Sequence, residues 1–187
     1  MENVKRIPYG VSNFVEVVEQ NQYYVDKTMY LPLLERQPDS LFFIRPRRFG
    51  KSIFLGMLWA YYDMSQKDKF QKRFGNLWVG SHPTPNQGKY QVLFFDFSRA
   101  SVGMGTLEEN FNSYCCIVLN GFMSTYSDYY SEKLQSDFYE SKSAANKLNL
   151  INSEAKQKGY LLYLIIDEYD NFTNVVLNEQ GEKSITI

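Results

Sequence analysis

The pattern of apolar residues constrains the fold of this chain more than any other feature of its sequence. Three short runs are almost continuously apolar, and they occupy residues 41–44, 92–97 and 160–166. Such runs are typical of strands that are buried on both faces of a parallel sheet. The segments between them show the periodicity of amphipathic helices. Strands that alternate with helices predict an α/β fold with a mostly parallel sheet.

Capping residues indicate where the helices begin and end. Asn13 is expected to cap a short N-terminal helix, and the pair Thr106 and Glu109 forms the T-x-x-E pattern of a capping box. A helix or a pair of helices is expected over residues 131–158. Gly159 follows at the position where a glycine commonly closes a helix.

Charge and cysteine content exclude several classes of protein. The 187 residues include 20 basic and 21 acidic side chains, so the net charge of −1 gives no overall attraction for nucleic acid or anionic membranes. Cys115 and Cys116 are adjacent, and a disulfide between neighbours is strained, so we expect core thiols and a reducing cytoplasm. The N-terminus lacks the apolar region of a signal peptide, and no run approaches membrane-spanning length. His82, the single histidine, is expected at the surface.

A basic loop lies between the first apolar run and the helix that follows it. The loop ends in Gly50, Lys51 and Ser52, the second half of the phosphate-loop pattern G-x-x-x-x-G-K-[ST]. In this pattern the glycine lets backbone N–H groups approach phosphate, the lysine contacts the β- and γ-phosphates, and the hydroxyl binds Mg²⁺. Arg45 stands where the first glycine is expected. The position between a strand and a helix N-terminus still favours a phosphate-binding loop.

The remaining loop residues leave alternatives open. Arg47 and Arg48 either contact phosphate or hold the loop in shape, and we expect Phe49 and Ile53 to complete the nucleotide contacts. A basic surface turn that is solvated or touches nucleic acid is the structural alternative.

The third apolar run ends in two acidic residues, as in a Walker B motif. Asp167 is expected to bind Mg²⁺, and Glu168 to orient and deprotonate an attacking water. The alternative is an aspartate that caps a helix beside an exposed glutamate. Asp96 ends the second run, where it either supports the metal site or caps a loop. Because ligands of open α/β sheets bind at the carboxyl ends of strands, these positions fit one site.

Five segments resemble a known family, in the order IPYGVSNF, YYVDKT, LFFIRPRRFGKSIFLGML, VLFFDFS and YLIIDEYDNF. Together they cover about residues 6–178 and are similar to the predicted AAA-ATPase-like family of bacterial P-loop proteins, in which the first glycine is also replaced. The resemblance implies a three-layer α/β/α P-loop fold with a mostly parallel sheet. It also implies that Gly50, Lys51 and Ser52 contact nucleotide and Mg²⁺, and that Asp167 and Glu168 form the Walker B pair.

The resemblance also implies an organisation and a function. Residues 1–39 form an N-terminal helical extension, and residues 40–187 the P-loop core through Walker B. Family members continue with a further strand, more helices and often a nuclease-like domain, so we expect the C-terminal strands of the sheet to be missing here.

The implied function is ATP binding with Mg²⁺, and hydrolysis in the full-length form. The alternatives are an interaction module without turnover and a part of a nuclease-associated protein, with nucleic acid reached only through the missing domain. The sequence identifies no protein partner or homo-oligomer. Tyr9 or Phe14 is a candidate for stacking on adenine, the alternative being that both are core residues.

Overall fold

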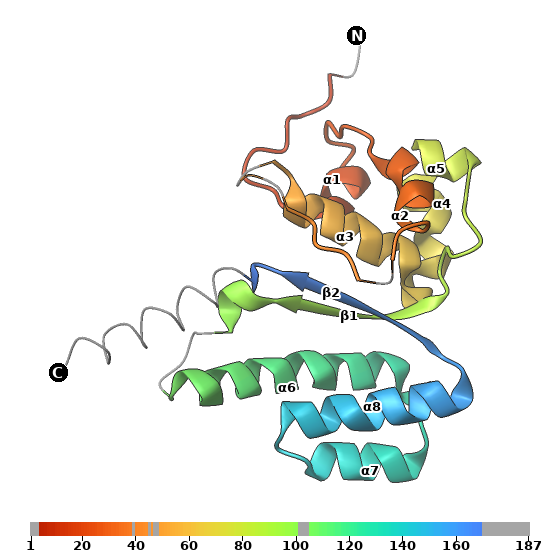
Figure 1. Ribbon diagram of the computed structural model, residues 1–187. Coiled ribbons are helices and arrows are strands. Elements are labelled where there is room, and N and C mark those ends of the chain that lie inside the picture. Colours follow the sequence, from red (N-terminus) through yellow and green to blue (C-terminus); the bar gives the residue numbers. More distant parts are fainter. Residues whose placement is uncertain (1–3, 39, 45, 47–48, 101–104, 170–187) are drawn as a thin grey trace, which may run out of the picture. The chain divides into compact units, whose positions relative to one another are not determined.

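The computed structural model describes residues 4–38, 40–44, 46, 49–100 and 105–169 (Figure 1). They form a mixed α/β protein that is mostly helical. The chain divides into two compact units, residues 1–90 (unit 1) and residues 91–187 (unit 2). Within the described ranges, no helix has both the length and the apolar character needed to cross a membrane.

Short helices around one longer helix make up unit 1. In chain order they are α1 (Phe14–Glu19), the 3-10 helix η1 (Thr28–Tyr30), α2 (Leu31–Leu34), α3 (Lys51–Tyr62), the 3-10 helix η2 (Met64–Lys69), α4 (Phe70–Phe74) and α5 (Trp78–Ser81). The central helix α3 packs against α1 and η2. The first helix begins as its sequence predicts, because the Asn13 side chain accepts hydrogen bonds from the backbone N–H groups of Val15 and Glu16.

Aromatic side chains form the core of unit 1. Phe14 is fully buried, and its ring lies 5.2 Å from that of Phe74 and 5.3 Å from that of Tyr24. Tyr61, on α3, packs edge-on against Phe74 at 5.5 Å. Large rings that meet in these geometries contribute beyond their buried area, so they fix α1 and α4 against α3.

An ion-paired cluster joins α1 to α4 within unit 1. Glu19 accepts hydrogen bonds from Arg73 Nε at 2.8 Å and from Lys72 Nζ at 2.5 Å. The Lys72 contact, followed by the Arg73 contact, lowers the pKa of the Glu19 carboxyl to about 2. Arg73 is buried, so this guanidinium depends on the carboxylate for a charged partner.

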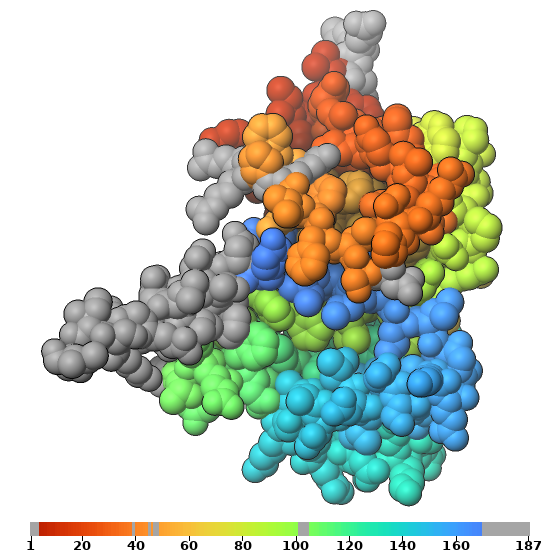
Figure 2. Space-filling view, in the orientation of Figure 1, coloured from red at the N-terminus to blue at the C-terminus, as the bar shows by residue number. Residues whose placement is uncertain are grey.

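The first apolar run is not a strand, and the prediction of a buried strand over residues 41–44 is wrong. These residues have no regular secondary structure, and Phe42 and Ile44 are more than 80% exposed. They follow α2 on the surface of unit 1, drawn in orange in Figure 2. A strand needs a neighbour to accept its backbone hydrogen bonds. Among the described residues, the sheet consists of β1 and β2, and this segment pairs with neither.

Unit 2 combines a small sheet with a layer of helices. Its elements are β1 (Tyr90–Asp96, which starts on the last residue of unit 1), the 3-10 helix η3 (Phe97–Arg99), α6 (Leu107–Tyr126), the 3-10 helix η4 (Ser127–Tyr129), α7 (Glu132–Glu140), α8 (Ala144–Lys158) and β2 (Leu161–Asp167). The strands β1 and β2 are neighbours in a two-stranded parallel sheet. Helix α8 packs against α6, α7 and β2 (Figure 1).

The helix signals in unit 2 are confirmed. The Thr106 hydroxyl accepts from the Glu109 backbone N–H while the Glu109 carboxylate accepts from the Thr106 backbone N–H, which is a complete capping box. The region 131–158 forms the pair α7 and α8, and Gly159 closes α8 in the left-handed conformation with φ 73°.

The two strands differ in how much of each is buried. In β1, Val92, Leu93 and Phe95 are buried, as predicted. In β2 only Ile165 and Asp167 are buried, so the prediction of a strand buried on both faces is wrong for β2. Toward the end of β2, buried Ile165 and Asp167 alternate with exposed Leu164 and Ile166, so only one face of this strand is covered.

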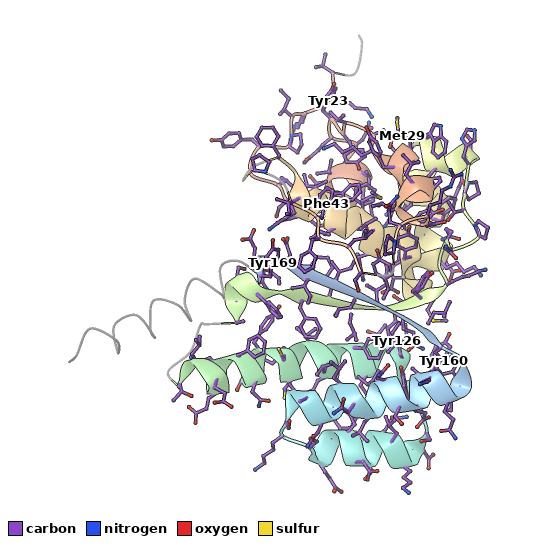
Figure 3. All side chains as sticks on the ribbon, viewed as in Figure 1. Tyr23, Met29, Phe43, Tyr126, Tyr160 and Tyr169 are labelled. Carbon is purple, nitrogen blue, oxygen red and sulfur yellow. The ribbon has the colours of Figure 1, made fainter. Side chains whose placement is uncertain are left out.

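Tyrosine side chains connect the sheet of unit 2 to its helices. The Tyr130 hydroxyl donates to Gln91 Oε1 at 2.7 Å, and both side chains are buried. The Tyr160 ring, which precedes β2, lies edge-on to Tyr129 at 5.6 Å. Figure 3 labels Tyr160 and also Tyr126, the buried last residue of α6. Aromatic side chains therefore contribute to the cores of both units.

Candidate functional site

Helix α3 begins directly after a glycine in the left-handed conformation. Gly50 precedes the helix with φ 76° and ψ 28°, a left-handed conformation that glycine adopts without the steric cost paid by other residues. The first intrahelical bond runs from the Phe54 N–H to the Gly50 carbonyl at 3.1 Å. Among the residues that the structure describes, no side chain caps the helix, and its first turn holds no acidic residue. An uncapped N-terminus with its N–H groups directed outward favours an anion.

The predicted loop residues are accessible to a ligand. Gly50, Lys51, Ser52 and Ile53 are each half-buried, and the Phe49 ring is 63% exposed. The prediction of roles for Arg47 and Arg48 falls outside the described residues, as does Arg45.

An aromatic contact links the first turn of α3 to the segment that precedes the loop. Phe54, on the first turn of α3, is buried and stacks on Phe43 with ring centroids 4.8 Å apart. Figure 3 labels Phe43 beside α3. The loop is therefore anchored at its end by the buried face of α3 and at its beginning by Phe43.

Lys27 is a residue of this region that sequence reasoning missed. An ideal Cβ built on Gly50 would lie 3.7 Å from Lys27 Nζ. The two residues are 23 positions apart, so no local pattern indicates that they are close. The available signal is the segment YYVDKT, which contains Lys27 and is one of the segments that resemble the family.

The Asp-Glu pair lies at the end of β2 in unit 2. Asp167 is its last residue and is 4% exposed. Glu168 follows with φ 56°, and its backbone N–H donates to Asp167 Oδ1 at 2.9 Å. A non-glycine residue in the left-handed region is uncommon, and its conformation costs free energy. Residues with such backbone strain cluster at functional positions.

Asp96 ends the neighbouring strand, and its carboxylate caps the loop. Its Oδ1 accepts hydrogen bonds from the Ser98 N–H at 3.1 Å and from the Ser98 hydroxyl at 2.7 Å. Arg99 Nε lies 3.9 Å from Asp96 Oδ2. The structure therefore confirms the capping alternative for Asp96. Because β1 and β2 are parallel neighbours, Asp96 and Asp167 end at the same edge of the sheet, and a supporting role at a metal site stays a prediction.

The remaining candidate residues from the sequence differ in how exposed they are. Phe14 is fully buried between Tyr24 and Phe74, so the prediction that it stacks on adenine is wrong, because its faces are already covered. Tyr9 is 97% exposed, so it is not a core residue, and its adenine contact stays a prediction. His82 lies at the surface as expected, with its ring stacked on Trp78 at 4.5 Å.

The two adjacent cysteines differ in burial. Cys115 is buried, and burial raises the pKa of its thiol to about 11, which agrees with a core thiol. Cys116 is half-buried, and both cysteines are free. In the part of the chain that the structure describes, no three His, Cys, Asp or Glu side chains gather in a way that could hold a metal ion.

A helix that begins at a glycine-lysine-serine sequence, and a parallel strand that ends in an Asp-Glu pair, are features of phosphate-loop α/β proteins. The chain belongs to the family of predicted AAA-ATPases, whose model matches residues 8–186. The match confirms the resemblance expected from the sequence motifs.

One curated relative has a shorter region of similarity. It is the "Uncharacterized protein in vnfD 5'region" of Azotobacter chroococcum mcd 1, which is 46% identical over 55 residues. That match covers 29% of this chain and 11% of the relative. No solved structure matches the chain significantly.

Proposed function

We propose that this chain binds ATP through the loop that precedes α3. The observation that supports this most directly is the helix start at Gly50, a left-handed glycine before a helix that no described side chain caps. Lys51 and Ser52 follow it in the order that a phosphate loop requires. The helix dipole and the Lys51 ammonium would both favour the phosphate groups.

The rest of the loop is proposed to complete the nucleotide contacts. Phe49 is exposed and Ile53 half-buried, so both are accessible to a bound nucleotide. Arg47 and Arg48 are proposed to contact phosphate, since a guanidinium presents a planar set of donors that matches phosphate oxygens.

The donor atoms fit a magnesium ion. Mg²⁺ prefers oxygen ligands, and the Ser52 hydroxyl and the Asp167 carboxylate are oxygen donors. The Asp167 carboxylate is buried and is oriented by the N–H of Glu168, as a ligand should be. We therefore propose Ser52 and Asp167 as the residues that hold Mg²⁺. When bound, the ion neutralises charge on phosphate oxygens.

Glu168 is proposed to be the catalytic base in the full-length family form. Its carboxylate would orient a water molecule and accept a proton from it, while Lys51 stabilises the charge that develops on the phosphate. The strained backbone of Glu168 supports a functional position.

We further propose that the two units belong to a three-layer P-loop fold. We also propose that the free thiols reflect a cytoplasmic location.

The decisive experiment separates binding from turnover. Purified wild-type protein is titrated with ATP in the presence and absence of Mg²⁺, and release of inorganic phosphate is measured in parallel. We expect Mg²⁺-dependent binding that Lys51→Ala weakens at least about tenfold, because a charged contact to phosphate contributes about 1.5–3 kcal/mol.

Three outcomes decide between the alternatives. Glu168→Gln should bind ATP like the wild type but release no phosphate above background. Binding without phosphate release by the wild type would favour a module without turnover. Binding that is unaltered by Lys51→Ala would refute the phosphate-loop assignment.

A further inference from the structure

We propose that Lys27 is a second cationic contact for the phosphates of the nucleotide, in addition to Lys51. The inference rests on the proposed function and extends the site to a residue outside the phosphate-loop motif. Lys27 Nζ lies 3.7 Å from the position of a Cβ on Gly50, the residue that begins the proposed anion site. An ammonium at this distance from the loop backbone can contact an anion that the loop binds.

The backbone on either side of Lys27 is held by hydrogen bonds to α5. Asp26 Oδ2 accepts from the Trp78 N–H at 2.6 Å, and Asp26 Oδ1 accepts from the Thr28 N–H at 2.8 Å. The fully buried Thr28 hydroxyl donates to Asp26 Oδ1 at 2.7 Å and accepts from the Val79 N–H at 3.1 Å. We call these contacts of Asp26 and Thr28 the DKT clamp. It fixes the backbone from which the Lys27 side chain extends to Gly50.

The electrostatic arrangement favours an anionic ligand. Lys27 Nζ lies beside the N-terminus of α3, where the helix dipole is positive, and Lys51 is the first residue of that helix. The first turn of α3 holds no acidic residue. Lys27 and Lys51 thus place two basic residues near the N-terminus of a twelve-residue helix, and a polyphosphate is the ligand chemistry that matches positive charge at such an end.

The DKT clamp thereby contributes to ligand binding as well as to folding, because it positions Lys27. Lys27 would add affinity for the phosphate chain irrespective of the base, because an ammonium contacts phosphate as a point charge. Its contribution should therefore depend on salt, since counterions screen charges that are partly accessible to solvent. A lysine that only supports the loop would affect the stability of the unliganded protein instead.

The test compares Lys27→Gln and Lys27→Arg with a matched control, Lys89→Gln, which removes an exposed lysine of the same unit. Affinity for ATP and ADP with Mg²⁺ is measured by titration at two salt concentrations, and the melting temperature of each unliganded protein is recorded. We expect Lys27→Gln to weaken binding at least about fivefold and to reduce its salt dependence. Lys27→Arg should retain most of the affinity, and Lys89→Gln should bind like the wild type.

A failure of the role proposed for Lys27 can be distinguished from a failure of the proposed ATP binding. If Lys51→Ala abolishes binding but Lys27→Gln stays within about twofold of the wild type, the role of Lys27 is wrong and the proposed function stands. If Lys27→Gln lowers the unliganded melting temperature and Lys27→Arg fails to restore affinity, Lys27 is structural and the inference is refuted. If the wild type does not bind ATP, the proposed function fails and this inference fails with it.

Discussion

The carboxylate of Asp26 accepts a hydrogen bond from the backbone N–H of Trp78 at 2.6 Å, across 52 positions of the sequence. The same carboxylate accepts two further hydrogen bonds from Thr28, so one side chain joins the segment before η1 to the start of α5. Asp26→Ala removes all three acceptor contacts and leaves the donors of buried Thr28 unpaired. We expect a loss of about 2–4 kcal/mol in the free energy of unfolding, measured with urea. Asp68→Ala, at an exposed position of unit 1, is the control and should change stability by less than about 0.5 kcal/mol.

The ion-paired cluster of Glu19 predicts a specific dependence of stability on pH. The pKa of this carboxyl is lowered in the folded protein from 4.5 to about 2, first by Lys72 and then by Arg73. Its contribution is therefore fully present above about pH 4.5 and is lost as the pH falls toward 2. Urea denaturation of the wild type and Glu19→Gln between pH 7 and pH 2.5 should give stability curves that converge in acid. Glu16→Gln, on the same helix, should leave the difference between neutral and acidic pH as in the wild type. Parallel curves for the wild type and Glu19→Gln would contradict the prediction.

Two left-handed glycines provide a matched pair of substitutions. Gly50 and Gly159 have φ 76° and 73°, and within the described part of the chain an added Cβ meets no atom closer than 3.7 Å at Gly50 and none within 4 Å at Gly159. Substitution by alanine should therefore cost about 1–2 kcal/mol of stability at each position, because the strain lies in the backbone. Only Gly50→Ala should also weaken ATP binding, since Gly50 shapes the proposed phosphate site. Equal ATP affinities in the two variants would contradict the assigned role of Gly50.

The buried thiol predicts a difference in reactivity between neighbours. Burial raises the pKa of Cys115 to about 11, so this thiol is almost entirely protonated at pH 8. In single-cysteine variants, Cys116→Ser should react with iodoacetamide much more slowly than Cys115→Ser, as followed by mass spectrometry. Labelling in urea should remove the difference. Rapid labelling of Cys115 in the folded protein would show that the core around α6 opens more readily than its burial indicates.

Local signals in the sequence predicted the helices of unit 2 and the start of α3. A capping box and a closing glycine act within a few residues, so Thr106 and Gly159 determine helix ends regardless of the remainder of the fold. The strand β1 was predicted for a related reason, since its apolar side chains are buried as their pattern requires.

The features that the sequence did not predict depend on contacts between residues that are far apart in the chain. The run at residues 41–44 has the composition of a strand. A strand forms only beside a second strand, and apolar composition alone does not show whether a second strand is present. Phe14 matched both a core residue and an adenine contact, and only its packing against Phe74 distinguishes them. The approach of Lys27 to Gly50 depends on the DKT clamp, whose partners in α5 are about 50 positions away.

At position 168, the backbone conformation and the proposed catalytic role favour different residues. With φ 56°, this residue occupies a conformation that glycine and asparagine adopt at lower cost. A library of substitutions at position 168 that is sorted only for folded protein should therefore enrich glycine and asparagine over the native glutamate. The same library sorted for phosphate release should retain glutamate. Retention of glutamate under the second selection, together with its loss under the first, would show that the carboxylate at position 168 serves turnover rather than folding.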